Sequence, residues 1–195
     1  MTNTESRSLL ILGLGNSLCS DDGLGVAAVG RLSREWDVPA NASILDGGTL
    51  GLSLLPYLQE AQDVILLDAI RTDDPPGTFV RIDGEDVAPA VATRLSVHQI
   101  GVADLLDGAR WLDSYPRRLT LLGLVPATME LGLELSPSLQ RGVEGLLEAT
   151  VAEAASMGYV LRRRTSAIVA AGASDAGDIV DLWLPAAAAA PRPAC

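Results

Sequence analysis

The chain has 195 residues, of which 48% are apolar and 20% charged, and its 14 arginines and 25 carboxylates give a formal net charge of −11. These proportions are typical of a globular domain with a real core. The acidic balance argues against nucleic acid and anionic membrane surfaces as partners. Two cysteines and one histidine exclude a disulfide scaffold, a four-cysteine zinc site and any site that requires two histidines.

The beginning of the chain lacks the features of a targeting segment. Its first residues include Glu5 and Arg7 and lead into only a short apolar stretch, whereas a signal peptide has a cationic start and a longer apolar region. No uninterrupted run of about 20 apolar residues, as a membrane-spanning helix requires, is present. We therefore expect a cytoplasmic protein with no membrane partner.

Short apolar runs alternate along the chain with longer segments of helical period. The patterns predict strands over 8–12, 42–45, 63–67, 77–82 and 118–125, and helices over 22–36, 50–59, 99–112 and 136–157. Ser136 and Pro137 are residue types favoured at a helix N-cap and first turn. Strands that are apolar throughout and alternate with helices predict a three-layer α/β/α fold, with a mostly parallel sheet covered on both faces.

The composition changes after Arg164. Residues 165–195 contain 11 alanines, including Ala186–Ala190, and three prolines. This composition predicts a flexible appendage, in which residues 179–184 (IVDLWL) form the single apolar cluster. We therefore divide the chain into a domain over residues 1–164 and an Ala/Pro-rich tail over residues 165–195.

Chemistry-bearing side chains follow the predicted strands. Ligands bind outside the carboxyl ends of the strands in an open parallel sheet. The first strand is followed by Asp21 and Asp22, the second by Asp46 and the third by Asp68, while His98 precedes a helix. Carboxylates and an imidazole gathered at one rim suit a divalent metal such as zinc, nickel or manganese.

Each of these residues also has a common structural role. Acids in the first turn of a helix stabilise it, and we expect Asp21 to cap the helix while Asp22 faces the cleft. Asp68 could bond to local backbone N–H groups, and His98 to the backbone at its helix N-terminus. Two other catalytic arrangements stay open: a Cys19 nucleophile with His98 as base, and a metal-free Asp22/Asp68 pair that shares a proton.

Nucleotide binding is disfavoured. The third glycine of a G-x-G-x-x-G motif would fall at Leu18, so the dinucleotide motif fails. Asp21 and Asp22 would repel a pyrophosphate at the helix start, and a chain without lysine cannot form a Walker loop.

Six segments in chain order resemble the hydrogenase maturation proteases, the endopeptidases that trim the C-terminus of nickel–iron hydrogenase large subunits. They are Gly13–Asn16, Asp21–Gly25, Leu45–Thr49, Leu67–Ala69, Ser96–Gln99 and Gly123–Pro126. The resemblance extends from about Leu9 to Tyr159 and implies a twisted five-stranded sheet with helices on both faces.

The resemblance also implies a site and a substrate. Its catalytic and metal-contacting residues correspond to Asp22, Asp68 and His98, with Asp22 in a position that is Glu in some members. The metal is nickel, carried by the substrate and not permanently bound, and the partner is the immature large subunit. We further expect contacts with the substrate from Asn16, Asp46, Gly47, Gly48 and Thr49.

Several expectations concern how the substrate is recognised. Glycines 23, 25, 47 and 48 would let a peptide backbone approach closely, and the loops Arg71–Pro76 and Pro126–Leu135 would set specificity. We expect a monomer. Two alternative functions remain on the same fold: a non-catalytic nickel-sensing maturation chaperone, and a metal-independent aspartic-type peptidase.

Overall fold

The computed structural model describes residues 8–92 and 97–165, with only the backbone for residue 92 and residues 97–100. The compact unit that contains the sheet ends at Arg164. Residues 166–195, and with them the predicted flexibility of the tail, lie outside the described residues. No helix in the described ranges is long and apolar enough to cross a membrane.

A five-stranded sheet forms the centre of the domain, in the order β3-β1-β4-β6-β5. The first four of these strands are mutually parallel, and β5 pairs antiparallel with β6. The predicted mostly parallel sheet is therefore confirmed. The strands are β1 (Leu9–Leu14), β3 (Ala42–Gly48), β4 (Asp63–Ala69), β5 (Phe79–Asp83) and β6 (Arg118–Leu124).

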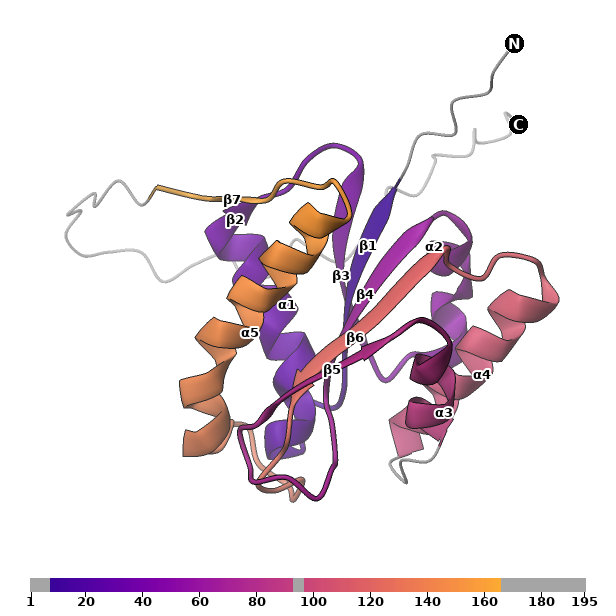
Figure 1. Cartoon of the computed structure of the whole chain (residues 1–195). Helices are drawn as coiled ribbons and strands as arrows, with labels where there is room; N and C mark the ends of the chain where they lie inside the picture. The colour runs from indigo at the N-terminus through magenta and orange to yellow at the C-terminus, as the bar shows by residue number, and fades with distance from the viewer. Residues whose placement is uncertain (1–7, 93–96, 166–195) are drawn as a thin grey trace, which may run out of the picture. The chain divides into compact units, whose positions relative to one another are not determined.

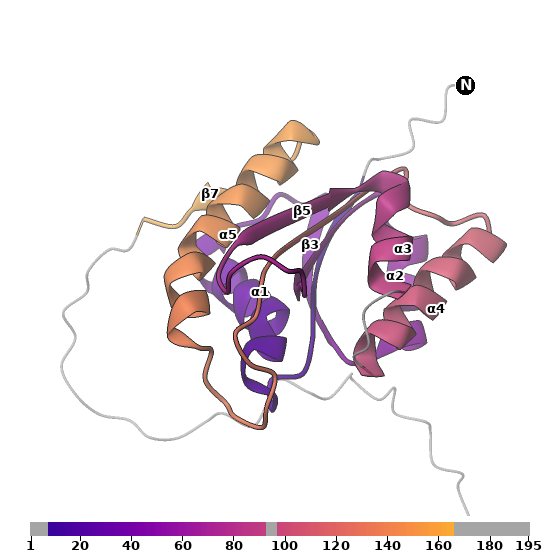
Figure 2. The same cartoon turned by 60° about the horizontal axis from the view of Figure 1, so that its bottom comes forward.

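Helices cover both faces of this sheet, as Figures 1 and 2 show from two directions. One face carries α1 (Leu24–Glu35) and α5 (Pro137–Ser156), and the other carries α2 (Leu55–Gln59), α3 (Val87–Ala92) and α4 (Val97–Trp111). Every residue of β1 and β4 is buried, because a strand between two helical layers has no face in water.

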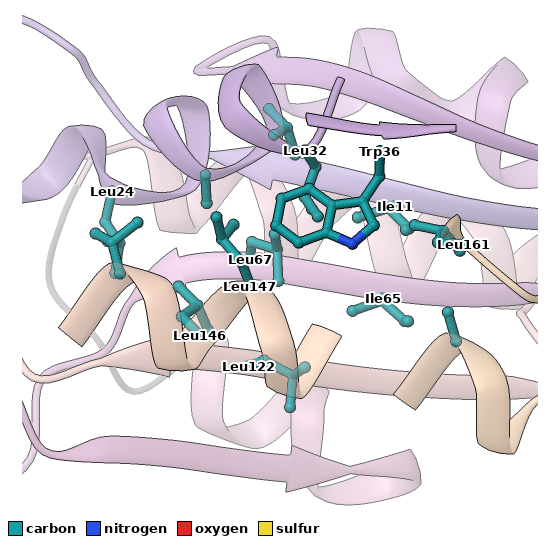
Figure 3. Close-up of a cluster of buried hydrophobic side chains, with 14 of the residues drawn as sticks. Ile11, Leu24, Leu32, Trp36, Ile65, Leu67, Leu122, Leu146, Leu147 and Leu161 are labelled. Carbon is teal, nitrogen blue, oxygen red and sulfur yellow. The ribbon is translucent and has the colours of Figure 1, made fainter. Parts of the chain in front are cut away.

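The two faces have separate apolar cores. Figure 3 shows the core beneath α1 and α5, where Trp36 packs among leucines and isoleucines from the helices and from β1, β4 and β6. The second core fills the space under the other helices and includes Leu12, Leu66 and Leu105. Alternate residues of each central strand thus point into different cores, as the period of a strand requires.

Several boundaries differ from those predicted. The helix expected over 22–36 begins as a 3-10 turn, η1 (Ser20–Gly23), and the helix expected over 50–59 begins as η2 (Gly51–Leu54). The strand predicted to end at residue 45 continues to Gly48, because β3 keeps pairing with β1 up to Leu14. The Ser136 cap is confirmed, since its side chain accepts a hydrogen bond from the Leu139 amide, with Pro137 in the first turn.

Four short elements were not predicted. The helix α3 follows a 3-10 turn, η3 (Gly84–Asp86), and β2 (Trp36–Asp37) pairs antiparallel with β7 (Arg162–Arg163). Strands of two residues carry no periodicity that a sequence could reveal. The β2–β7 pair ties the end of the domain to the end of α1, and Arg163 stacks over the Trp36 ring at 4.7 Å from its centroid.

The edge where the parallel strands begin holds a buried polar cluster around Asp63. The carboxylate of Asp63 accepts hydrogen bonds from Arg118 Nε at 2.8 Å, Arg118 Nη2 at 2.6 Å and the Tyr159 hydroxyl at 2.8 Å. Burial works to raise the pKa of Asp63, but the bonds from Arg118 and Tyr159 outweigh it and leave the pKa below its ordinary value. This cluster joins β4, β6 and the segment that follows α5.

Candidate functional site

The opposite edge, where the parallel strands end, brings three loops together at Gly15. The amide of Gly15 donates to the carbonyl of Gly48 at 3.0 Å. A Cβ at Gly15 would lie 1.8 Å from the carbonyl oxygen of Asp22 and 3.7 Å from Asp68 Oδ1. The backbone φ of +117° also favours glycine at this position. Gly15 is therefore the point at which the ends of β1, β3 and β4 meet.

Asp22 and Asp68 lie beside this junction and are buried, each with 4% of its surface exposed. Asp22 belongs to η1, and its Oδ2 accepts a hydrogen bond from the Asn16 amide at 3.0 Å. Asp68 is near the end of β4, and its Oδ1 accepts from the Ala69 amide at 2.7 Å. The structure thus brings together the two carboxylates that the sequence placed at one rim.

His98 lies in the first turn of α4, so it begins the helix and does not precede it as predicted. The start of α4 is held against the segment that follows β3, because a Cβ on Gly51 would lie 3.1 Å from the Cα of Gly101. His98 lies about one helical turn before Gly101, so its backbone is close to the segment that follows β3. Its side chain lies outside the described residues, and its role as a ligand stays a prediction.

Among the side chains that the structure describes, no three His, Cys, Asp or Glu residues gather as metal ligands would. The donors that are described, the carboxylates of Asp22 and Asp68, are of a type that binds divalent first-row metals. Three ligands would require the imidazole of His98.

Asp21 has a different role from the one predicted. It makes no side-chain cap bond to its own helix. Its fully buried carboxylate instead accepts hydrogen bonds from the amides of Ala127 at 2.7 Å, Thr128 at 3.2 Å and Ser136 at 2.6 Å. Asp21 therefore closes the loop between β6 and α5, and the cap assignment is wrong. No pattern near Asp21 could have revealed partners more than 100 residues away.

The predicted substrate-contacting residues form the rest of this edge. Asn16 Oδ1 accepts from the Leu18 amide at 3.0 Å, and the exposed Asp46 accepts from the Gly48 amide at 3.0 Å. Thr49 is exposed beside them. These contacts shape two turns that border the two buried carboxylates, and contact with a substrate stays a prediction.

At three of the four glycines expected to let a substrate backbone approach, other atoms of this chain already occupy the space beside the glycine. A Cβ would lie 2.9 Å from Ser17 Cα at Gly23, 2.1 Å from the Leu67 carbonyl oxygen at Gly25, and 2.7 Å from a Leu12 methyl at Gly47. These glycines let η1 pack closely against the loop that follows β1, α1 against β1 and β4, and β3 against β1. Only Gly48 has more room, with its nearest such neighbour 3.7 Å away.

The two loops predicted to set specificity lie next to each other. Arg71 Nε contacts Met129 Sδ at 3.1 Å, and the Gly77 amide donates to the Val125 carbonyl at 2.8 Å. The half-buried free thiol of Cys19 lies in a third loop, whose backbone pairs with Gly132. The side chain of His98, the predicted base for Cys19, lies outside the described residues, and this arrangement stays a prediction.

Comparisons with known proteins agree with this geometry. A family model described as hydrogenase maturation protease matches residues 26–153. The hydrogenase expression/formation protein HupD of Rhodobacter capsulatus is 38% identical over 179 residues, which are 91% of this chain and 81% of that protein. The hydrogenase 2 maturation protease of Escherichia coli is 35% identical over 145 residues, 74% of this chain and 88% of that protein.

Solved structures extend the likeness to the fold. The hydrogenase maturating endopeptidase HybD from Escherichia coli superposes with a TM-score of 0.79 at 33% identity, covering 81% of this chain and 98% of HybD. A maturation protease called HybD from Thermococcus kodakarensis gives a TM-score of 0.63 at 29% identity, covering 74% of this chain and 97% of that one. The similarity spans nearly the whole of each of these two proteins and 74% to 81% of this chain.

Proposed function

The chain belongs to the hydrogenase maturation protease family and is an endopeptidase, and from this premise we propose that it removes the C-terminal extension of a nickel–iron hydrogenase large subunit after nickel insertion. The observation that carries the proposal is the pair of buried carboxylates beside Gly15: Asp68 Oδ1 would lie 3.7 Å from a Cβ at Gly15, and Asp22 Oδ2 is bound by the amide of Asn16, the next residue. The substrate is an immature large subunit that already holds nickel.

The carboxylates would recognise the nickel that the substrate carries. Carboxylates carry negative charge and are common ligands of divalent cations, so a metal ion that arrives at this edge would be attracted to Asp22 and Asp68. Nickel is also well matched by carboxylate and imidazole donors. Asp22, Asp68 and His98 would then contact the ion together, and cleavage would depend on whether the subunit had been loaded.

Backbone amides and one exposed turn of this chain would orient the groups that meet the nickel and the peptide. The amides of Asn16 and Ala69 orient one oxygen each of Asp22 and Asp68. The exposed turn of Asp46 and Gly48 borders the same edge, where a peptide strand could lie across it. The nickel, when bound, supplies Lewis acidity to a nearby carbonyl or water.

The decisive experiment measures the mass of a precursor large subunit after incubation with this protein. We expect the wild-type chain to shorten nickel-loaded precursor and to leave nickel-free precursor intact. Asp68→Ala and His98→Ala should abolish the shortening while keeping the circular dichroism spectrum of the wild type. Asp107→Ala, which removes an exposed acid from α4, is the matched control and should cleave normally.

Other outcomes would select the alternatives. Equal cleavage of loaded and nickel-free precursor would favour a metal-independent aspartic pair formed by Asp22 and Asp68. A stable complex with loaded precursor and no change of mass would favour a nickel-sensing chaperone. Full processing by both alanine variants would contradict the assigned site.

A further inference from the structure

An exposed group of leucines lies beside the candidate site. Leu131 and Leu133 are 88% and 79% exposed, and Leu18 is 58% exposed. The backbone joins them, since the Gly132 amide donates to the Leu18 carbonyl at 2.9 Å and the Ser20 amide donates to the Gly132 carbonyl at 2.8 Å. We call Leu18, Leu131 and Leu133 the leucine patch.

The leucine patch is held next to the turn that carries Asp22. The three hydrogen bonds to the carboxylate of Asp21 hold both ends of the loop that carries Leu131 and Leu133, and Asp21 precedes Asp22 in η1. Leu18 lies two residues after Asn16, whose amide holds Asp22. A molecule that binds the patch is therefore placed against the edge that holds the carboxylates.

The patch has acidic flanks. Glu130 and Glu134 are exposed on either side of Leu131 and Leu133 in the sequence. Within the described part of the chain, neither glutamate forms an ion pair. Exposed apolar groups rimmed by charge are typical of protein interaction sites, and a partner that desolvates the leucines would gain further from basic groups opposite the two glutamates.

The acidic residues beside the leucine patch indicate which kind of partner would bind there. The chain's own apolar cluster at residues 179–184 lies in a tail with three aspartates and a single arginine, so it brings the wrong charge. A second copy of this chain brings the same two glutamates and the same net charge of −11. A partner with apolar side chains between basic residues has the complementary chemistry.

We propose that the leucine patch is the docking site for an apolar segment with basic flanks on the substrate large subunit, close to the bond that is cut. The inference rests on the proposed function, since that function brings the substrate to this edge. The patch would supply affinity while Asp22 and Asp68 meet the metal, so binding and cleavage would depend on different residues.

The test compares two double variants of the full-length chain. Leu131→Ser with Leu133→Ser should raise KM for nickel-loaded precursor by about tenfold or more, with kcat within about twofold because no group at the reacting centre changes. Trp111→Ser with Leu112→Ser removes comparable exposed apolar surface at the far end of α4, where Trp111 is 89% exposed. This control should leave KM unchanged.

A second comparison tests the charge argument. The pair Glu130→Gln with Glu134→Gln should weaken the dependence of KM on salt concentration, because fewer complementary charges remain to be screened. An unchanged KM in the leucine variant, or an equal rise in the control, would overturn the proposal. So would a wild-type dimer that the leucine variant dissociates, or a lower KM when Ile179→Ser and Leu182→Ser are introduced in the tail.

Failure of the proposed function would look different. If the wild type shortened no precursor, the affinity of the wild type and the leucine variant for nickel-loaded precursor would still be measured by titration. Weaker binding by the leucine variant alone would support the patch, and equal binding would contradict it.

Discussion

At the edge where β4 begins, the carboxylate of Asp63 is held by Arg118 and Tyr159, whereas at the edge where β4 ends, Asp22 and Asp68 accept hydrogen bonds from backbone amides. Both edges bury aspartates, but the donors described for them differ. The guanidinium of Arg118 carries a charge opposite to that of Asp63 and lowers its pKa, whereas the amides of Asn16 and Ala69 orient Asp22 and Asp68. The first arrangement suits a structural joint, and the second fits our proposal that a cation carried by the substrate binds there.

The largest effect that would test this difference between the two edges is expected when the charge of Asp68 is removed. Asp68→Asn keeps the shape of the side chain but removes its charge, so we expect cleavage of nickel-loaded precursor to fall by at least about 100-fold. The urea midpoint should stay near that of the wild type. A variant that cleaves at the wild-type rate would show that the charge at this edge is not used.

The opposite result is expected at Asp63. Asp63→Asn should lower the free energy of unfolding by about 3 kcal/mol, the lower end for a broken buried pair, because the Arg118 side chain is 33% exposed. Urea denaturation measures this, and the folded fraction should still cleave. Glu85→Gln, which removes an exposed pair with Arg110, should leave the urea midpoint unchanged.

Asp21 has a structural role, as Asp63 does, but it lies next to the candidate site. Asp21→Asn removes the charge that three amides share, and we expect a loss of about 2 kcal/mol in the free energy of unfolding. Hydrogen exchange should become faster at Ala127, Thr128 and Ser136. Unchanged exchange at these amides would contradict its assignment as the residue that closes the loop.

The smallest effect near neutral pH concerns acid stability. The pKa of Asp63 is lower in the folded protein than its ordinary value, so its contribution is fully present above about pH 3.9 and is lost as the pH falls through the folded pKa. Thermal unfolding should therefore hardly change between about pH 7 and pH 5 on this account. Asp63→Asn should lessen the decline below about pH 4, and an identical acid profile would contradict the role of this carboxylate.

Local sequence patterns predicted much of the secondary structure of this protein. Apolar runs bounded by glycine and aspartate predicted the strands, and Ser136–Pro137 predicted the start of α5. Because the ends of parallel strands share one edge, the same patterns also predicted that Asp22 and Asp68 lie at one rim of the sheet. Periodicity and strand direction are properties of short segments, and the sequence by itself therefore determined the fold class and the edge that carries the carboxylates.

The remaining features depend on segments that are far apart in the chain. The partners of Asp21, the close packing at Gly25 and Gly47, the β2–β7 pair and the leucine patch all join distant residues. Nothing near Asp21 distinguishes a helix cap from a carboxylate that closes a loop 106 residues away. Only the tertiary structure decides such contacts, because they follow from how whole elements pack against one another.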